Sequence, residues 1–431
     1  MITRTRDIPV VAQYDVVVCG GGPAGFTAAV AAARGGARTA LIERYGFFGG
    51  MATAGLVAPV SVFNHDGRRM IGGIPWEFVE RLVEAGGARE ERPSGNITFS
   101  PEAYKLIAQR MLLEAGVSLY LHSYLTGCEI SGGVVTHAVI ENKNGAEAIA
   151  GKIFIDCTGD ADLAFMAGVP MQPTGETLQP ASLIFMLGGV DTEALPMIRH
   201  SQSGVNYHDL DIRRILEDAG REREIPLFGG PWYCGVLAKG VVLMNMTRTW
   251  ADMADNRAST AAECTLREHV HLFTGLLREN VPAFRDAVLL ATAPQAGVRE
   301  TRRIKGFHTL TGEEYLAAVD FPDAVSRGCH PVDIHSATTG EQRCEFLEKA
   351  AFVPYRCLIA PGFPNLLVAG RSLSADQVAS ASVRVQASVM GLGQAAGVAA
   401  ALCIGSGSSV AEVDIAVLRK ILTEYGANLS I

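Results

Sequence analysis

The stretch Tyr14-Asp-Val-Val-Val-Cys19-Gly20-Gly21-Gly22-Pro23-Ala24-Gly25 decides the fold of this 431-residue chain. Val16 to Cys19 form a continuous apolar run, which is typical of a strand buried on both faces. Gly20, Gly22 and Gly25 follow at the G-x-G-x-x-G spacing. In that pattern the first glycine permits a tight turn and the second lets the backbone approach a pyrophosphate. The third lets the following helix pack close against the strand.

The residues after Gly25 supply the rest of a dinucleotide-binding unit. An alanine-rich run predicts a helix whose free N–H groups and positive dipole end face the phosphates. A second apolar run, Arg38-Thr-Ala-Leu-Ile-Glu43, ends about 20 residues on in an acid that can accept bonds from ribose hydroxyls. Because strand, turn, helix, second strand and acid occur in the required order, an ordinary glycine turn is a weak alternative.

Composition limits the classes of protein that remain. The chain is longer than one usual domain, and 48% hydrophobic with 19% charged residues is typical of a soluble globular protein. A net charge of −8 argues against nucleic acid as a main partner. Nine scattered cysteines without a C-x-x-C pair predict no metal site and suit a reducing cytoplasm. The apolar stretch from Val383 to Gly405 carries polar side chains and many small residues, so we expect a close-packed core helix and no membrane span.

The rest of the chain predicts an α/β fold in two domains. Ser100-Pro101-Glu102 begins a helix, and Asn144-Gly145 marks a hairpin within an inserted β-meander. Strands at 181–187 and 241–247 and a helix at 259–277 indicate a second, mixed α+β substrate domain, and 365–371 returns to the first. This C-terminal strand-glycine-helix unit mirrors the N-terminal one, which predicts that both ends of the chain converge on one extended ligand and favours FAD over NAD. We expect a Rossmann-like FAD-binding domain at 1–58, 98–170 and 350–431, and a substrate or cap domain at 59–97 and 171–349.

Five blocks of the sequence resemble the FAD-dependent oxidoreductase family with a glutathione-reductase-like fold, in particular a diverse bacterial group. They are Gly20 to Gly25, Glu43-Arg44…Gly49-Gly50-Met51-Ala52-Thr53, Asp156-Cys157-Thr158-Gly159-Asp160-Ala161-Asp162, Gly297 to Ile304, and Val368-Ala369-Gly370-Arg371…Ser382-Val383-Arg384-Val385. The similarity spans nearly the whole chain in the same order. It is specific for FAD and says little about the substrate.

The resemblance implies which residues bind noncovalent FAD. The ADP half would lie on Gly20, Gly22, Pro23, Ala24, Gly25 and Glu43. The pyrophosphate, ribityl chain and flavin would lie along Arg44, Gly50, Met51, Ala52 and Thr53, with Asp160, Gly370, Arg371, Val383 and Arg384 completing the site. No second glycine fingerprint appears, so a dedicated NAD(P)H domain is not expected. Gly370-Arg371-Ser372 stands where flavin hydroxylases carry Gly-Asp-Ala-Ala-His, which disfavours a monooxygenase.

Catalytic candidates come from the long segment between the two FAD-binding ends. His330 and His335 lie in a glycine- and proline-bounded loop and are candidate acids or bases, or else two hydrogen-bonded structural histidines. Arg299 and Arg302 belong to a cationic cluster that can orient a substrate carboxylate or a reduced flavin, or else form an ion-pair network with Glu300. Tyr355 precedes the return strand and is expected at the domain junction.

These residues lead to a functional expectation. We expect hydride transfer between flavin N5 and a small organic substrate at the domain interface, by an enzyme of the dehydrogenase or reductase type. A monooxygenase or oxidase, and an electron-transfer component that serves a protein partner, are the alternatives. The electron acceptor or donor is open, and a homo-oligomer is compatible with the sequence.

Overall fold

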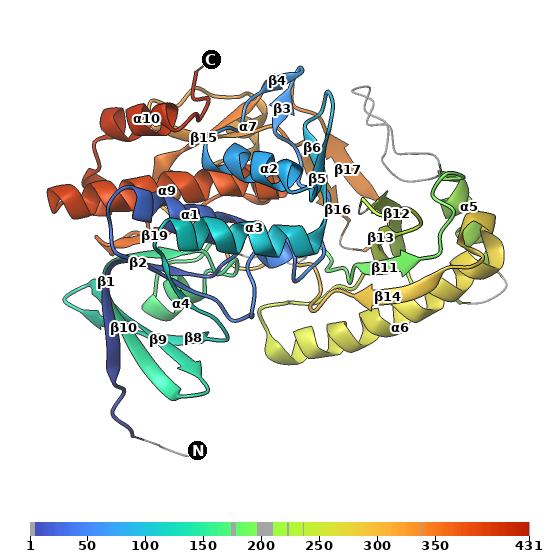
Figure 1. Ribbon diagram of the computed structural model, residues 1–431, viewed down its shortest axis with the longest axis horizontal. Coiled ribbons are helices and arrows are strands. Elements are labelled where there is room, and N and C mark those ends of the chain that lie inside the picture. The colour runs from blue at the N-terminus through green and yellow to red at the C-terminus, as the bar shows by residue number, and fades with distance from the viewer. Residues whose placement is uncertain are drawn as a thin grey trace.

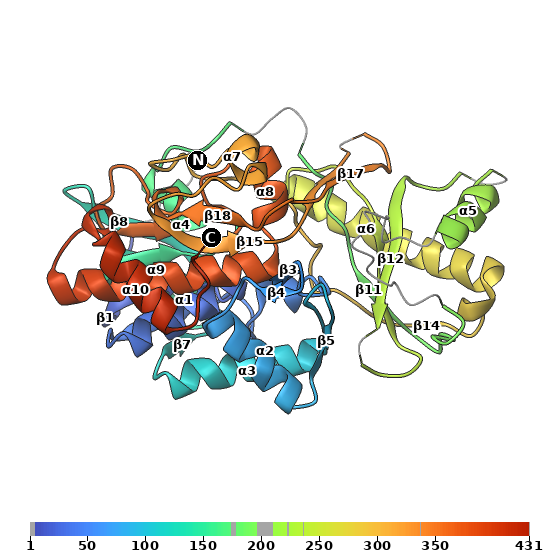
Figure 2. The same ribbon diagram turned by 90° about the horizontal axis from the view of Figure 1, so that it is seen from above.

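The computed structural model describes residues 5–173, 178–195, 210–221, 224–235, 237–336 and 338–430. Two lobes lie side by side, as Figures 1 and 2 show. The larger lobe contains helices α1 (Pro23–Arg34) and α9 (Gln386–Ser406) on its main sheet. The smaller lobe contains an antiparallel sheet beside the long helix α6 (Asn256–Asn280). The first strand and the last helix both belong to the larger lobe.

A seven-stranded sheet carries the larger lobe. Its order is β7 (Ser118–Tyr120), β2 (Thr39–Ile42), β1 (Val10–Cys19), β10 (Gly145–Asp156), β9 (Val134–Asn142) and β8 (Tyr124–Ser131), with β19 (Leu366–Val368) paired to β10. The pairs from β7 to β10 and the pair β10–β19 are parallel, whereas β10–β9 and β9–β8 are antiparallel. The predicted hairpin at Asn144-Gly145 is confirmed, and the meander extends the parallel sheet on one side.

Helix α9 packs along α1 through glycines. A Cβ atom on Gly393 would lie 2.0 Å from the Ala24 carbonyl oxygen, and one on Gly397 would lie 2.2 Å from that of Ala28. By length and hydropathy α9 passes as a membrane span, but 78% of its most apolar window is buried inside the protein. The close-packed core helix predicted for this stretch is therefore confirmed, and it holds α1 against the sheet.

Replacing Gly393 with alanine is expected to destabilise the larger lobe. The added methyl group has no room against the backbone of α1, and overpacking of this kind costs about 1–3 kcal/mol. Gly405 in the same helix is the matched control, because a Cβ there meets nothing within 4 Å. Thermal unfolding followed by circular dichroism should show a lower midpoint for Gly393→Ala and no loss for Gly405→Ala. Equal midpoints would contradict the close packing.

The remaining elements of the larger lobe surround this core. The helices are α2 (Ile74–Glu84), α3 (Pro101–Glu114), α4 (Asp162–Ala167), α7 (Gly312–Leu316), α8 (Gln377–Val383) and α10 (Ile415–Glu424), with 3-10 turns η1 (Gly50–Ala52), η3 (Tyr355–Cys357) and η4 (Val410–Glu412). Four antiparallel pairs are β3 (Asn64–His65) with β4 (Arg68–Arg69), β5 (Ala88–Glu91) with β6 (Asn96–Phe99), β15 (Ala324–Gly328) with β18 (Ala351–Pro354), and β16 (Val332–His335) with β17 (Gln342–Glu345). The predicted helix start is confirmed, since Ser100 Oγ accepts the Ala103 N–H at 3.4 Å.

The smaller lobe is built on a four-stranded antiparallel sheet. Its order is β12 (Phe228–Gly235), β13 (Val242–Thr247), β11 (Phe185–Gly188) and β14 (Val288–Thr292), and it is accompanied by α5 (Leu210–Ala219), α6 and the turn η2 (Pro282–Phe284). The strand expected at 181–187 begins only at Phe185. Ala181 and Ser182 instead form single bridges with Thr249 and Gly297, which direct this segment toward the junction of the lobes.

The hydrophobic cores divide the chain differently from the expected domain boundaries. Residues 59–97 were expected in the cap, yet Phe78 and Leu82 of α2 are buried in the same core as α9. Tyr315 and Val325 from the expected substrate domain belong to that core as well. The core of the smaller lobe comes from Leu56 and from residues 181–296. The reason is that the apolar face of α2 and the strands after residue 300 bury themselves against α8 and α9.

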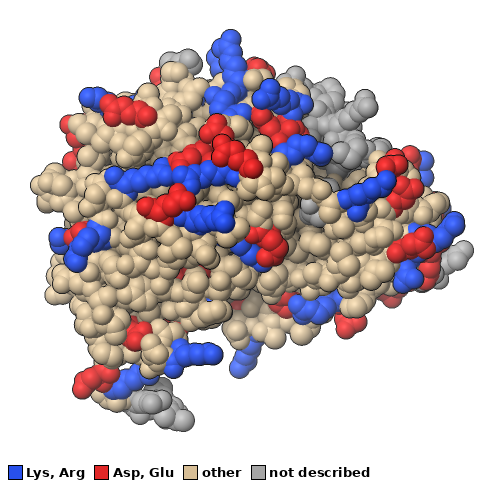
Figure 3. Space-filling view, viewed as in Figure 1, with Lys and Arg blue, Asp and Glu red and all other residues tan. Residues whose placement is uncertain are grey.

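The architecture is the α/β class that the sequence predicts, with a mixed sheet in one lobe and an antiparallel sheet in the other. On the face shown in Figure 3, basic and acidic side chains are intermixed, and they do not gather into an area of one sign.

Candidate active site

The three fingerprint glycines have three different surroundings. Gly20 has φ +98°, and a Cβ there would lie 2.4 Å from the Cys157 carbonyl oxygen. A Cβ on Gly25 would lie 1.8 Å from the Gly20 carbonyl oxygen, so this glycine lets α1 approach the turn. By contrast, a Cβ on Gly22 would meet only Gly50 Cα, at 3.8 Å, because Gly22 faces open space. Gly20 thus forms the turn, Gly25 allows the close contact with the helix, and Gly22 leaves room for a ligand, as the fingerprint requires.

Glu43 lies directly behind this turn. Its carboxylate accepts the Gly21 N–H at 2.7 Å and the Tyr45 N–H at 2.9 Å. Burial raises the pKa of Glu43, although these two backbone bonds oppose the change. The same side chain lines the cavity beside Gly22, so its carboxylate both fixes the turn and faces the ligand space.

One cavity of about 450 Å³ runs from the glycine turn to the smaller lobe. Segments that are far apart in sequence line it together. From the larger lobe these are Gly20, Gly22, Pro23, Ala24, Glu43, Arg44, Gly50, Met51, Gly159, Asp162, His330, Asp333, His335, Gly370, Arg371, Arg384 and Gln386, and from the side of the smaller lobe Ser182, Ile184, Trp232, Leu243, Asn245, Val298 and Arg299. Most of the expected cofactor residues and three of the expected catalytic residues therefore share one space.

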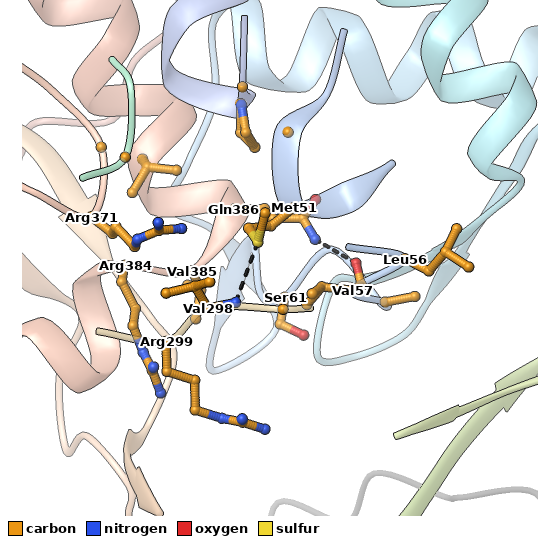
Figure 4. Close-up of a pocket in the computed structure, with 18 of the residues that line it drawn as sticks. Met51, Leu56, Val57, Ser61, Val298, Arg299, Arg371, Arg384, Val385 and Gln386 are labelled. Atoms are coloured by element: carbon orange, nitrogen blue, oxygen red, sulfur yellow. Dashed lines mark hydrogen bonds between the residues drawn. The ribbon is translucent and has the colours of Figure 1, made fainter. Parts of the chain in front are cut away.

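Met51 sits at the middle of this cavity, as Figure 4 shows. Its carbonyl oxygen accepts the Val57 N–H at 2.9 Å, and its sulfur accepts the Val298 N–H at 3.4 Å. Ala52 and Thr53 lie behind it and do not line the cavity, because both are fully buried and Thr53 Oγ1 donates to the Phe48 carbonyl. The glycine-rich block thus fixes Met51 between the two lobes.

Asp160 acts through its neighbour Arg371. Its Oδ1 accepts Arg371 Nη2 and Thr301 Oγ1, each at 2.5 Å, while Arg371 itself lines the cavity. Arg302 donates to the Asp160 carbonyl at 2.8 Å and pairs with Asp162, and it does not line the cavity. Burial, followed by Asp160 and Asp156, raises the pKa of Asp162 to about 6. Arg302 therefore supports this loop, and of the two predicted arginines Arg299 is the one that lines the cavity.

His335 forms a buried pair with Asp333. Its Nε2 lies 3.2 Å from Asp333 Oδ2, and its side chain is 8% exposed. Burial and the neighbouring charge of Arg299 lower the pKa of His335 to about 3, so the ring is neutral at pH 7. His335 is thus no proton donor at neutral pH.

His330 is better placed for proton transfer. Its Nδ1 lies 2.7 Å from the Pro331 carbonyl oxygen, which can only accept, so Nδ1 carries the proton in that bond. In the neutral ring Nε2 is then the basic nitrogen. The side chain is partly exposed and lines the cavity.

Two further expected site residues lie outside the cavity lining. Tyr355 is 1% exposed, and its hydroxyl donates to the Val410 carbonyl at 2.8 Å, so it serves the core and does not reach the lobe junction. Val383 is fully buried at the end of α8 and positions Arg384, the next residue. Packing in the core therefore explains the positions of both the Tyr355 and the Val383 side chains.

No sequence motif predicts the wall that the smaller lobe contributes to the cavity. This wall contains Ser182 from the segment before β11, Trp232 from β12 and Asn245 from β13. Arg248 stands behind them, where its Nη1 donates to Ser182 Oγ at 2.7 Å and Asn245 Oδ1 at 3.1 Å. The one sequence signal for Arg248 is that this charged residue directly follows the apolar strand β13.

The fold and this cavity define an α/β protein that binds a dinucleotide at a glycine turn and covers it with a second lobe. The chain belongs to the FAD dependent oxidoreductase family, whose model matches residues 15–422. FAD is therefore its cofactor, and the expected cofactor is confirmed.

Solved structures similar to the chain have low sequence identity to it. A geranylgeranyl bacteriochlorophyll reductase-like protein from Thermoplasma acidophilum gives a TM-score of 0.48 at 15% identity over 97% of this chain and 94% of that one. The myxobacterial chondrochloren halogenase gives 0.47 at 13% over 96% and 79%, and an aromatic hydroxylase of angucycline biosynthesis gives 0.49 at 12% over 96% and 69%. No curated protein matches the chain. These similarities are too low to assign a substrate or a reaction.

The residues around the glycine turn fit FAD. Gly22 leaves open space at the N-terminus of α1, where backbone N–H groups favour a phosphate. Arg371 Nε is buried without a hydrogen-bond partner in the described part of the chain. This N–H group can therefore donate a hydrogen bond to a ligand atom beside Gly370. Gly20, Gly22 and Pro23 would hold the pyrophosphate and Glu43 the ribose. The rest of the cofactor would contact further cavity-lining residues of this region, including Arg44, Gly50, Met51, Gly370 and Arg371.

Proposed function

We propose that the protein is an FAD-dependent dehydrogenase or reductase that transfers a hydride between flavin N5 and a small organic substrate. The observation that carries the proposal is the single cavity that continues from Gly22 to Ser182, because it joins the cofactor end to a chamber under the smaller lobe. When bound, FAD supplies the redox chemistry, and the protein supplies orientation, charge and a proton path.

The chain's own residues have distinct roles in this proposal. Met51 and Val298 separate the cofactor end from the substrate chamber and are joined by a hydrogen bond (Figure 4). His330 holds or accepts a proton at Nε2 on the substrate side. Leu243, Trp232 and Ile184 exclude water from the far wall. The concave and largely apolar lining of the chamber favours a small molecule over a protein partner as the direct electron donor or acceptor.

An anaerobic experiment tests the reaction type. The purified holoprotein is reduced with dithionite, and reoxidation of the flavin is followed by absorbance after addition of oxygen, a quinone or a protein-free metabolite extract. We expect the extract to reoxidise the flavin faster than oxygen does, because the chamber is built for an organic acceptor. Rapid peroxide formation with no organic acceptor would instead establish an oxidase. Exchange with a protein alone would establish an electron-transfer component.

A further inference from the structure

Arginine side chains gather where the cavity passes from the larger lobe to the smaller one. Arg299 and Arg384 line the cavity, and in Figure 4 both side chains extend toward the same side, away from Met51. Arg248 stands behind them. Arg299 Nη1 and Arg248 Nη1 both donate to Ser182 Oγ, at 2.8 and 2.7 Å, so one hydroxyl ties two cations together.

These guanidinium groups have no carboxylate partner among the described residues. Arg299 donates to the Pro180 carbonyl at 2.6 Å and to Ser182, which are neutral acceptors. Arg384 Nη2 donates to Gln179 Oε1 at 3.3 Å and to the Asp333 carbonyl at 3.0 Å, while its Nη1 is buried without a partner. Buried charges in proteins are ordinarily paired, so this arrangement leaves positive charge uncompensated.

The acids near the cluster do not cancel it. The Asp333 carboxylate is held by His335 and Gln342, and it is a single negative charge against three guanidinium groups. Glu300 is already paired with Arg303 at 2.5 Å. Burial and then the repulsion of Arg248 and Arg384 lower the pKa of Arg299 well below its usual value, and burial lowers the pKa of Arg248 to about 10. Asp333 opposes both changes, so it compensates part of this positive charge, but it forms no ion pair with any of the three arginines in the described part of the chain.

We infer that the substrate is an anion whose carboxylate group binds between Arg299 and Arg384. The inference rests on the proposed function for the place of the substrate. A planar guanidinium donates two parallel bonds to a carboxylate, which is stronger and more directional than a neutral contact. The chamber beyond the arginines is lined by Trp232, Leu243 and Ile184, so the body of the substrate is apolar or aromatic. Arg89 and Glu91 also line the cavity. They contribute one positive and one negative charge, so they do not change the net charge of the lining.

Benzoate and benzamide are suitable probes because they have nearly the same shape and differ in charge. Their binding to the FAD-loaded protein is measured by equilibrium dialysis at constant ionic strength, with the visible spectrum of the flavin as a second readout. Benzoate is expected to bind at least about tenfold more tightly than benzamide. Arg299→Gln and Arg384→Gln should each weaken benzoate binding by roughly ten- to a hundredfold, the usual size of a charge-assisted hydrogen bond.

Arg343→Gln is the matched control. Arg343 is exposed on β17, next to the cavity-lining Gln342, and its guanidinium pairs with Glu345, so its loss removes a nearby positive charge without touching the chamber. Benzoate binding should not change in this variant. If Arg384→Gln fails to retain FAD, Arg384→Lys takes its place, and it should weaken binding because a point charge does not replace a planar fork.

Several results would overturn the inference. These are equal binding of benzoate and benzamide, no benzoate binding at all, or the same loss in Arg343→Gln as in Arg299→Gln. A lower flavin reduction potential in Arg299→Gln with unchanged benzoate binding would assign the arginines to the reduced flavin instead. Because the assay measures binding without turnover, benzoate binding by a protein whose flavin exchanges no hydride would refute the proposed function alone.

Discussion

Replacing Gly22 with leucine should give a folded protein that no longer retains FAD. The backbone of Gly22 has φ −71°, which any residue adopts, and a Cβ there meets no protein atom closer than 3.8 Å. The new side chain therefore enters the ligand space and displaces the pyrophosphate without disturbing the apoprotein. We expect the affinity for FAD to fall by on the order of a hundredfold or more. Flavin absorbance of the purified protein and titration with FAD measure the loss.

The same substitution elsewhere separates steric exclusion from general damage. Gly275→Leu in α6 places a side chain where nothing lies within 4 Å, and it should leave FAD content unchanged. Gly25→Ala is the opposite case, because its Cβ would collide with the Gly20 carbonyl oxygen and should lower stability as well. Full FAD content in Gly22→Leu would refute the placement of the pyrophosphate.

Removing the His330 imidazole should slow turnover by on the order of a hundredfold while FAD stays bound, the usual scale for losing a general acid or base. The ring lines the cavity, and its bond to the Pro331 carbonyl leaves Nε2 as the basic nitrogen. The measurement compares single-turnover flavin reduction or reoxidation in His330→Ala and the parent protein, across pH. The pH dependence that belongs to the imidazole should disappear with it.

His271→Ala controls for loss of a histidine in general. His271 is exposed on α6 and does not line the cavity, so its loss should not alter the rate. A His330→Ala protein that retains the parent rate and pH profile would show that this histidine is structural. His335 would not take over the role at neutral pH, because a pKa of about 3 leaves its ring neutral and a weak base.

Local rules were sufficient for most of the larger lobe. The glycine spacing, the Ser100 cap and the hairpin at Asn144-Gly145 act within a few residues, so the sequence alone predicts β1, α1, α3 and the meander. The boundary at residues 59–97 could not be found in this way. An amphipathic helix such as α2 shows that it has an apolar face, but the partner of that face, here α9, is set by tertiary packing.

The same distinction applies to the site. His330, Arg299 and Arg384 stand in motif-like segments and lie at the cavity, whereas Tyr355 stood in an equally suggestive place and packs against Val410. A motif gives the position of a residue along the chain and not the direction of its side chain. Ser182 and Trp232 carry no local pattern at all, because the segment before β11 and the strand β12 of the smaller lobe bring them to the cavity.

The contact between α1 and α9 has a consequence for biosynthesis. The glycine turn and α1 leave the ribosome early, but the alanine face of α1 finds its partner only when Gly393 and Gly397 have been translated. Gly370 and Arg371, at the cofactor end of the cavity, also come late. The apolar face of α1 thus lacks its native cover until α9 has been translated, and we expect chaperones to bind it in that interval. Loading of FAD is expected to follow the synthesis of α9.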